Sequence, residues 1–370
     1  MKFETIAIHG GNLITDSHRP VVQPITLSTT FEHQKDSLIY SRANNPNRMA
    51  LENLLAKLEM GKSAAAFSSG NAAGMAVFQA LPHGSHVIAP SDMYHGLKKQ
   101  LVEIFHDKLE VTFIDLSYSQ KLKKSLQPNT KLIWIESPSN PLLKISDIKA
   151  LCKLARENDI ISICDNTFAT PVFQNPLKLG ADMVMHSTTK YLGGHSDILG
   201  GALITKEENK FWDQILNVQK TGGAVPSPFD CYYLTRSIKT LAYRMKGHAE
   251  HAGIIATFLN QHPMVENVFY PGLTQHPGHQ IAANQMTGFG GILSFLIKGG
   301  PENADKFISH LKFFSNATSL GGVESLIERR AAVEGPDTKT PQNLIRVSVG
   351  LEHLEDLLED LEQAFKKIKN

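Results

Sequence analysis

The chain has 370 residues, a formal net charge of +1 and an apolar fraction of 42%. This length is enough for a large buried core and for more than one domain. Acidic and basic residues nearly cancel and no basic run stands out, which argues against nucleic acid as a partner, and no apolar run approaches the roughly 20 residues that span a membrane.

The first segment, residues 1–45, is expected to form an arm rather than a core element. Within it Val21–Ile25 is extended, because Pro24 disfavours helix at the preceding residue. The polar segment that follows is either a simple turn or an anion clamp, with Arg42 as a fork and Tyr40 as a hydroxyl donor. Apolar residues at helical spacing then predict a helix: Met49, Leu51, Leu54, Leu55 and Leu58.

Two candidate phosphate sites follow that helix. Gly61–Ser63 resembles the end of a P-loop, but Ala56 stands where that motif needs glycine, so we reject a nucleotide triphosphatase. Next, a strand of small residues turns at Ser68–Gly70 into an alanine-rich helix. This is either a plain corner or a phosphate site, because the N-terminus of a helix offers free N–H groups, here at Gly70 and Asn71.

Short β-rich runs then alternate with helical stretches, and the runs are His86–Pro90, Val111–Asp115, Lys131–Glu136, Ile160–Asp165, Ala181–Met185 and Ala202–Thr205. The alternation predicts an α/β fold with a mostly parallel sheet and helices on both faces. Ligands in such sheets bind beyond the carboxyl ends of the strands. The polar residues there are Asp92, Tyr94, Glu136, Ser137, Asn140, Asp165, Asn166, Thr167, Ser187, Thr189 and Lys190.

Lys190 lies at the mouth of one of these strands, after three hydroxyl residues. Desolvation at such a place lowers the pKa of an ammonium group and suits a Schiff-base lysine. The alternative is an ordinary solvated surface lysine.

A second region begins near Pro226–Pro228. It contains a strand that carries Arg346, and it ends in an amphipathic helix over 354–368, with acids early and lysines late. The glycines in 286–295 resemble a dinucleotide fingerprint only loosely. From the order of these elements we predict three parts: an arm over 1–45, a cofactor-binding α/β domain over 46–228 and a smaller α+β domain over 229–370.

A phosphate site, a carboxylate, a lysine and an aromatic ring at one crevice fit pyridoxal 5′-phosphate (PLP). Asp165 suits the partner of the ring nitrogen, and Tyr94 suits a side chain stacked on the ring. The phosphate would lie at the start of the helix at Gly70, with Ser187 and Thr189.

The whole chain resembles the Cys/Met-metabolism family of fold-type I PLP enzymes, which have an aminotransferase-like fold. The resemblance depends on the motifs Tyr40–Arg42, Ser68–Gly70, Asp165–Thr167, Ser187–Lys190, Gly223–Asp230 and Ser319–Gly322. It implies a transsulfuration enzyme that acts on sulfur-containing or γ-substituted amino acids. A carbon–sulfur lyase or γ-replacement transferase of the cystathionine γ-lyase or γ-synthase type ranks first. Methionine γ-lyase and cystathionine β-lyase are alternatives, and a catalytically silent binding protein is remote.

The resemblance also implies residue roles. Lys190 is the Schiff-base lysine and proton shuttle, and Tyr94 protonates the leaving group. Arg346 and Ser319 are expected at the substrate: Arg346 is the fork for its carboxylate, and Ser319 also helps to position the lysine. The remaining residues are expected to bind the cofactor: Tyr40, Arg42, Gly70, Asn71, Asn140, Asp165, Thr167, Ser187 and Thr189. Tyr40 and Arg42 would reach the phosphate of a neighbouring subunit, which implies a homotetramer built from dimers with shared sites.

Several positions depart from the family pattern: Asn71, Gly96, Ile39, Thr318 and the pair Arg329 and Arg330. Gly96 stands where methionine γ-lyases carry cysteine. Acids are common at the positions of Ile39 and Thr318, so recognition of a distal ammonium is weakened. The two arginines either bind an extra anionic group of the substrate or are solvated.

The cysteines indicate the compartment. Cys152, Cys164 and Cys231 are widely spaced and form no CxxC pair, which predicts reduced thiols in the cytoplasm. We expect a small-molecule amino-acid substrate and neither a metal, a nucleic acid nor a membrane as partner.

Overall fold

The computed structural model describes residues 1–14, 18–35, 37–335 and 338–368. Its larger sheet has seven strands. In spatial order they are β1 (Ser63–Phe67), β7 (Gly201–Thr205), β6 (Met183–His186), β5 (Ile161–Asp165), β4 (Thr130–Glu136), β2 (Ser85–Pro90) and β3 (Leu109–Ile114). Only β7 runs antiparallel to its neighbours, so the prediction of a mostly parallel sheet is confirmed for the described residues.

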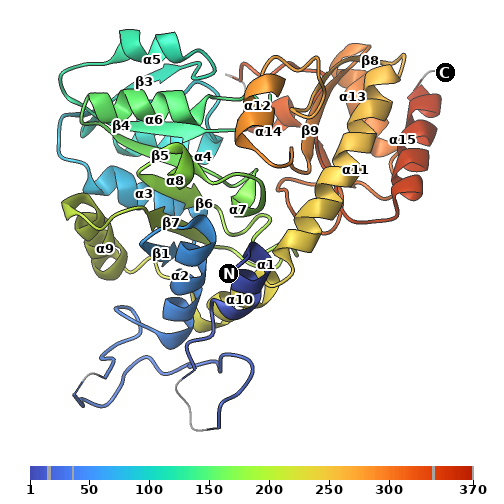
Figure 1. The fold of residues 1–370 in the computed structure, drawn as a ribbon. Coiled ribbons are helices and arrows are strands. Elements are labelled where there is room, and N and C mark those ends of the chain that lie inside the picture. Colours follow the sequence, from blue (N-terminus) through green and yellow to red (C-terminus); the bar gives the residue numbers. More distant parts are fainter. Residues whose placement is uncertain (15–17, 36, 336–337, 369–370) are drawn as a thin grey trace.

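Helices cover both faces of this sheet (Figure 1). The alternation along β4 shows why: Leu132 and Trp134 belong to one apolar cluster, and Ile133 and Ile135 belong to the cluster on the other face. A strand that is buried on both faces has an apolar residue at nearly every position. One cluster includes α2 (Pro46–Glu59), α6 (Ile148–Glu157) and α8 (Pro176–Leu179), and the other includes α3 (Gly70–Ala80), α4 (His95–Lys99) and α9 (Lys210–Gly222).

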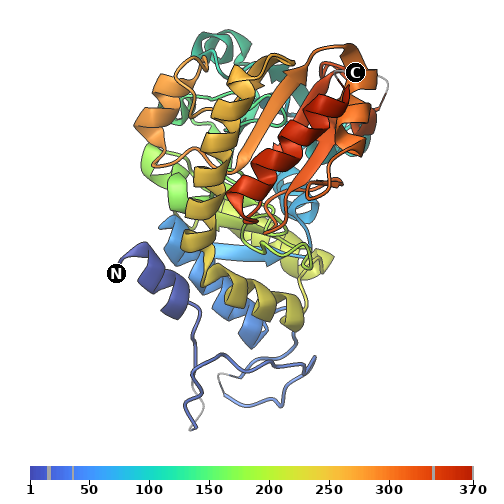
Figure 2. The ribbon, with the colours of Figure 1, turned by 90° about the vertical axis from the view of Figure 1, so that its right-hand side faces the viewer.

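A second sheet of five strands lies beside the first. Its order is β10 (Ser315–Asn316), β11 (Leu326–Arg329), β12 (Leu344–Ser348), β9 (Ile292–Ile297) and β8 (Val265–Phe269). One face packs on α11 (Leu241–Gln261), α13 (Gly300–Ser309) and α15 (Leu354–Ile368), as Figure 2 shows. In β12, Ile345 and Val347 belong to that apolar cluster, so the alternate residue Arg346 points the other way, toward the first sheet.

The chain passes from one sheet to the other along α11 (Figure 1). Before it, α10 (Pro228–Ile238) packs against α2. A capping box of Ser227 and Asp230, with proline at the first helical position, explains why α10 begins there. The division of the chain after residue 228 stays a prediction. The remaining helices are η1 (Gln100–Ile104), α5 (Ser119–Ser125), α7 (Thr170–Phe173), α12 (His279–Gln285) and α14 (Arg330–Glu334).

The N-terminus differs from the expectation of an arm without core elements. Residues Phe3–His9 form α1, which packs on α2 and α11 and buries Ala7. Phe3 and Ile6 also pack on the core, because residues spaced by three and four lie on one helix face. Beyond α1, the described residues 18–35 and 37–44 extend away from the body (Figure 1), with one isolated bridge between Thr30 and Tyr40.

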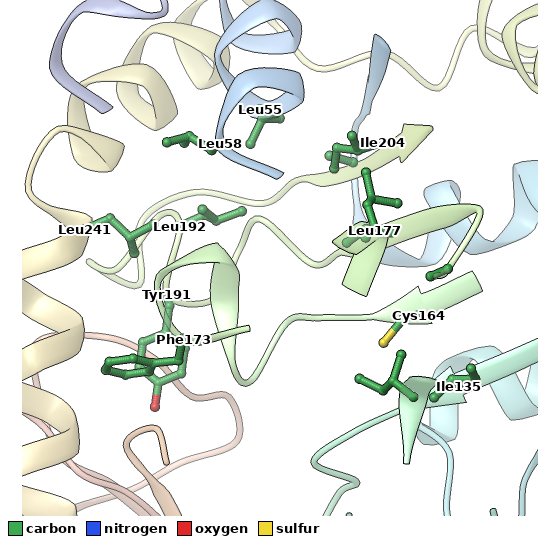
Figure 3. Packing of buried hydrophobic residues seen from close by; sticks show 14 of the residues in the cluster. Leu55, Leu58, Ile135, Cys164, Phe173, Leu177, Tyr191, Leu192, Ile204 and Leu241 are labelled. Atoms are coloured by element: carbon green, nitrogen blue, oxygen red, sulfur yellow. The ribbon is translucent and has the colours of Figure 1, made fainter. Parts of the chain in front are cut away.

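The backbone around Lys190 is anchored by the core. Tyr191 and Leu192 directly follow it and are buried in a cluster that includes Leu58 of α2 and Leu241 of α11 (Figure 3). Gly194 also donates its N–H to the Lys190 carbonyl at 2.7 Å. Apolar packing of Tyr191 and Leu192 therefore fixes the backbone at Lys190. Among the residues placed by the structure, no helix combines the length and apolarity needed to cross a membrane.

Candidate active site

Lys190 lies in the loop that follows β6 and is partly buried. Its Nζ donates a hydrogen bond of 2.7 Å to the hydroxyl of Ser319, from the second half of the chain. Burial lowers the pKa of the lysine from 10.5 to about 8, and the positive charge of Arg346 acts in the same direction. Lys190 is therefore no ordinary solvated lysine, and its neutral form is accessible near neutral pH.

Asp165 ends β5 and is 8% exposed. Its Oδ1 accepts the N–H of Thr167 at 3.0 Å, and the hydroxyl of Thr167 accepts the N–H of Ser187 at 2.9 Å. Burial raises the pKa of Asp165, while the hydrogen bonds from Thr167 oppose that shift. The structure thus brings together the ends of β5 and β6, as the sequence predicted.

A second carboxyl, Glu136, lies beside Asp165. The two residues end β4 and β5 and are paired across the sheet. Glu136 Oε2 accepts the N–H of Tyr94 at 2.8 Å. Burial, and then the charge of Asp165, raise the pKa of Glu136 well above its usual range. We therefore expect Glu136 to hold the proton of the pair. Glu136 was predicted at a strand end, without a role.

The start of α3 forms a cradle for an anion. A Cβ added to Gly70 would lie 3.0 Å from the Cβ of Ser187, so only glycine lets the two segments come this close without displacement. Ser69 caps the helix through the N–H of Ala72 at 3.0 Å. In the part of the chain that the structure describes, the N–H groups of Gly70 and Asn71 have no acceptor.

Thr189, the residue before Lys190, has its partners in the loop before β7. Its hydroxyl donates to the carbonyl of Gly200 at 3.2 Å and accepts the Gly200 N–H at 3.0 Å. Within one chain, Thr189 therefore already has two partners at the loop before β7.

The side chains of Tyr94 and Asn71 both lie close to the backbone of Gly96. A Cβ on Gly96 would lie 2.7 Å from the ring of Tyr94 and 2.9 Å from the amide of Asn71. Tyr94 is 41% exposed. A larger residue at position 96, such as the cysteine of methionine γ-lyases, would require Tyr94 or Asn71 to move.

Arg346 joins the two sheets. Its guanidinium donates to Asn140 Oδ1 at 3.1 Å and to the carbonyl of Ser319 at 2.8 Å, and it forms an ion pair with Glu328. Burial lowers the pKa of Arg346 to about 10, which leaves it charged at neutral pH. Glu328 was not among the predicted site residues. The two-residue alternation along β11 places Glu328 on the face opposite the buried Ile327, but only the register of β11 on β12 pairs it with Arg346.

Arg329 and Arg330 were expected either to bind an anionic group of the substrate or to be solvated. For Arg330, solvation is wrong. Arg330 is 6% exposed and forms ion pairs with Glu328 at 2.8 Å and Glu334 at 2.9 Å. Arg329 is partly buried and pairs with Asp305 at 2.7 Å.

The structure does not bring Tyr40 and Arg42 to the other predicted residues of the same chain. Tyr40 is 45% exposed, and Arg42 donates to the carbonyl of Lys220 at 2.8 Å. Between described residues, no hydrogen bond links either side chain to Gly70, Ser187 or Lys190.

These residues fit PLP by the chemistry of their donor set. The cradle at Gly70 and Ser187 offers free N–H groups to a phosphate, and Asp165 offers a buried carboxylate to a ring nitrogen. Lys190 offers an amine with a lowered pKa to an aldehyde. Over the described residues, no group of three or more side chains is arranged to hold a metal ion.

The fold and the site define a PLP-dependent enzyme. The family model described as Cys/Met metabolism PLP-dependent enzyme matches residues 4–366, and the chain belongs to this family. It is 44% identical to cystathionine gamma-synthase of Mycobacterium tuberculosis over 97% of this chain and 96% of that protein. It is 43% identical to cystathionine gamma-lyase of Bacillus subtilis over the full length of both. The crystal structure of metB from Corynebacterium glutamicum matches with a TM-score of 0.96 and 42% identity over 100% of this chain and 98% of the other.

Proposed function

We propose that the protein catalyses elimination or replacement at the γ-carbon of an amino acid, in the manner of cystathionine γ-lyases and γ-synthases. The observation that carries this proposal is the convergence on Ser319 of the Lys190 amine at 2.7 Å and the Arg346 guanidinium at 2.8 Å. A proton acceptor and a carboxylate fork thereby share one small region, as a reaction at the α-carbon of an amino acid requires. The full-length relatives named for both activities support the same chemistry.

Each side chain then has a role. PLP, when bound, supplies an electron sink that stabilises negative charge at the substrate Cα. Arg346 exchanges part of its pairing with Glu328 for the substrate carboxylate. The neutral Lys190 amine takes the Cα proton and later moves a proton at Cβ. Tyr94, half-exposed at the end of the site, donates a proton to the departing group.

The same geometry supports our assignment of the cofactor residues. We assign the phosphate to the cradle of Gly70, Asn71 and Ser187, with Thr189 at its border. Asp165, oriented by Thr167, would pair with the ring nitrogen, and Tyr94 would stack on the ring. Asn140, held by Arg346, would lie beside the 3-oxygen.

The exposed segment that carries Tyr40 and Arg42 supports a shared site. We propose that it completes the cradle of a second subunit and that two such dimers form a homotetramer. In each subunit, residues 46–228 would form the cofactor domain and 229–370 the smaller domain. We also propose a cytoplasmic location, because Cys152, Cys164 and Cys231 are buried, unpaired thiols.

The test is an assay of the purified holoenzyme against cystathionine, methionine, homocysteine and acylated homoserines, the last with and without cysteine. Release of 2-oxobutyrate, or formation of cystathionine, is the expected result. Release of pyruvate alone would instead assign the reaction to the β-carbon. Lys190→Ala, which removes the proton acceptor, serves as the blank.

A further inference from the structure

Arg48 is a buried arginine at the start of α2. It lies in the first turn of the helix, and only 1% of its surface is exposed. Its guanidinium is directed toward residues 40–44, the exposed turn that carries Tyr40 and Arg42. Because a guanidinium keeps its charge at neutral pH, burying it costs free energy unless its N–H groups find acceptors. The partners of Arg48 therefore indicate its role.

Three consecutive carbonyl groups of this turn accept hydrogen bonds from Arg48. Its Nη1 donates to the carbonyl of Ser41 at 2.9 Å. Its Nη2 donates to the carbonyl of Ala43 at 2.5 Å and to that of Arg42 at 3.4 Å. Hydrogen bonds from a charged donor are stronger than neutral ones, and the planar guanidinium fixes the directions of its N–H groups. Arg48 thus holds the backbone of the turn from its buried side.

Two other side-chain contacts join the turn to the body of the protein. Asn45 Nδ2 donates to the hydroxyl of Ser41 at 3.2 Å, which is a neutral hydrogen bond. Arg42 itself donates to the carbonyl of Lys220 at 2.8 Å. If Arg42 binds the phosphate of a neighbouring subunit, its guanidinium has to give up that carbonyl. The bonds from Arg48 then remain as the charged anchor of the turn.

Arg48 also has a contact that leads into its own subunit. Its Nε lies 3.5 Å from Oε1 of Glu52 and makes no hydrogen bond within the described residues. The same oxygen accepts the N–H of Ala66 at 2.9 Å, in the strand β1 that precedes the cradle. The Nη bonds to Ser41 and Ala43 are shorter than this Nε contact, so the geometry favours a role in the turn.

We propose that Arg48 is a positioning residue for the active site of the neighbouring subunit, because it fixes the turn from which Tyr40 and Arg42 reach that subunit's phosphate cradle. This inference rests on the shared site of the proposed function. Loss of Arg48 should then impair the neighbour's site and spare the site that contains Lys190 of the same chain. A merely structural role would impair both sites.

The first measurement is the affinity of the apo-protein for PLP, from an equilibrium titration followed by absorbance. Arg48→Met keeps an aliphatic side chain but removes every donor. We expect its affinity for PLP to fall by about tenfold or more, the range of hydrogen bonds from a charged group. Arg48→Lys keeps the charge without the planar fork and should lose less. It stands in if Arg48→Met fails to fold.

Mixed dimers show in which site Arg48 acts. Two variants are co-expressed with different affinity tags, and the species that carries both tags is purified. Arg48→Met paired with Lys190→Ala should contain one intact site, formed by Lys190 of the first chain and the turn of the second. Arg48→Met paired with Arg42→Ala should contain no intact site, because both turns are defective.

Covalent trapping gives a readout besides turnover. Borohydride fixes PLP on the lysine that binds it, and mass spectrometry then shows which chain carries the cofactor. At a PLP concentration near the wild-type Kd, the Arg48→Met chain should carry PLP when it is paired with Lys190→Ala. The same chain should carry about tenfold less as the pure variant or when it is paired with Arg42→Ala.

Arg244 provides the matched control within one subunit. It is also a buried arginine, and it donates to the carbonyl of Tyr191 at 2.7 Å, directly after Lys190 of its own chain. Arg244→Met should therefore show the opposite pattern. It should recover activity and trapped PLP when it is paired with Arg42→Ala, and neither when it is paired with Lys190→Ala.

The outcomes separate this inference from the shared site on which it rests. The pair of Arg42→Ala and Lys190→Ala tests the shared site alone, and no recovery there would refute both. If that pair recovers, Arg48→Met that behaves like Arg244→Met overturns the inference, because Arg48 would then act through Glu52 on its own cradle. Arg48→Met that recovers in neither pair overturns it as well, since both sites would depend on it.

Discussion

Lys190 and Ser319 lie 129 residues apart in the chain, but the Lys190 Nζ donates to the Ser319 hydroxyl at 2.7 Å. The lysine follows a strand of the first sheet, and the serine lies between two strands of the second. Ser319 has a φ of 130°, which non-glycine residues rarely adopt. Such a backbone persists only where the surrounding structure enforces it, so the packing of the two sheets sets the position of the amine.

The effect of backbone strain at Ser319 on stability can be separated from the effect of losing its hydroxyl. Ser319→Ala and Ser319→Gly both remove the hydrogen bond to Lys190, but only glycine adopts a φ of 130° without strain. We expect Ser319→Gly to be more stable than Ser319→Ala by about 1 kcal/mol, the reverse of the usual order. Urea unfolding of the apo-proteins measures the difference. Both variants should lose turnover to a similar extent, and a more stable alanine variant would contradict strain at this position.

The lowered pKa of Lys190 predicts how cofactor attachment depends on pH. Only the neutral amine reacts with an aldehyde, and the amine has a pKa of about 8 instead of 10.5. The attachment rate of PLP to the apo-protein should therefore rise up to about pH 8 and then level off. Stopped-flow absorbance measures this rate. Lys190→Ala should show no covalent band, while Lys206→Ala, an exposed lysine after β7, should keep it.

The same shift has a consequence for stability. Because the folded-state pKa is lower than the unfolded one, the charged lysine costs stability in full below about pH 8. The cost disappears as pH rises from about 8 toward 10.5, since there the unfolded chain binds more protons. Lys190→Met should thus stabilise the apo-protein at pH 7, and this advantage should shrink as pH increases. A constant difference across that range would argue against a buried amine.

The strand ends could be predicted from sequence because they depend on local patterns. A buried parallel strand is an apolar run, so the polar residue that ends it, such as Asp165, marks the functional edge of the sheet. The role of Gly70 in a turn could also be predicted, because the turn into the helix depends on residues that are adjacent in sequence. For both, periodicity and turn chemistry within about ten residues were sufficient.

Partners on neighbouring strands of one sheet were not predictable in this way. Glu328 binds Arg346 because β11 pairs with β12 in one particular register, which no local pattern reveals. Glu136 was visible as a polar strand end, but its proximity to Asp165 depends on the order of the strands. The helix α1 was missed because its seven residues offer too few turns for a clear period.

The pairing of Arg346 predicts its kinetic effect. Arg346→Ala should raise KM for every amino-acid substrate by about tenfold to a hundredfold, because it removes a charge-assisted fork. The KM of Arg346→Lys should lie between those of the wild type and of Arg346→Ala, since lysine keeps the charge without the planar geometry. Arg329→Ala, an arginine of the adjacent strand that pairs with Asp305, is the matched control and should leave KM within about twofold. An unchanged KM in Arg346→Ala would remove it from substrate binding.

Glu136 should tolerate an amide. Burial and the charge of Asp165 raise the pKa of Glu136 well above its usual range, which favours the protonated carboxyl. Glu136→Gln keeps an acceptor for the Tyr94 N–H and should hold the cofactor within about twofold of the wild-type affinity. Glu136→Ala leaves that N–H without its acceptor and should weaken cofactor binding by about tenfold. Equilibrium titration of the apo-proteins with PLP compares them, and equal damage in both variants would show that Glu136 is ionised.

The exposed segment of Tyr40 and Arg42 allows a test of shared sites. If Arg42 completes the cradle of a neighbour, each site takes Lys190 from one subunit and Arg42 from the other. Arg42→Ala and Lys190→Ala then remove residues that different subunits contribute to the site. Both pure variants should then be nearly inactive. After co-refolding, a mixed dimer contains one site with both defects and one with neither, so activity should reappear. Co-purification through an affinity tag carried by only one variant confirms that subunits have mixed. If Arg42 acted within its own chain, one site would lack the arginine and the other the lysine, and the mixture would stay as inactive as its parents.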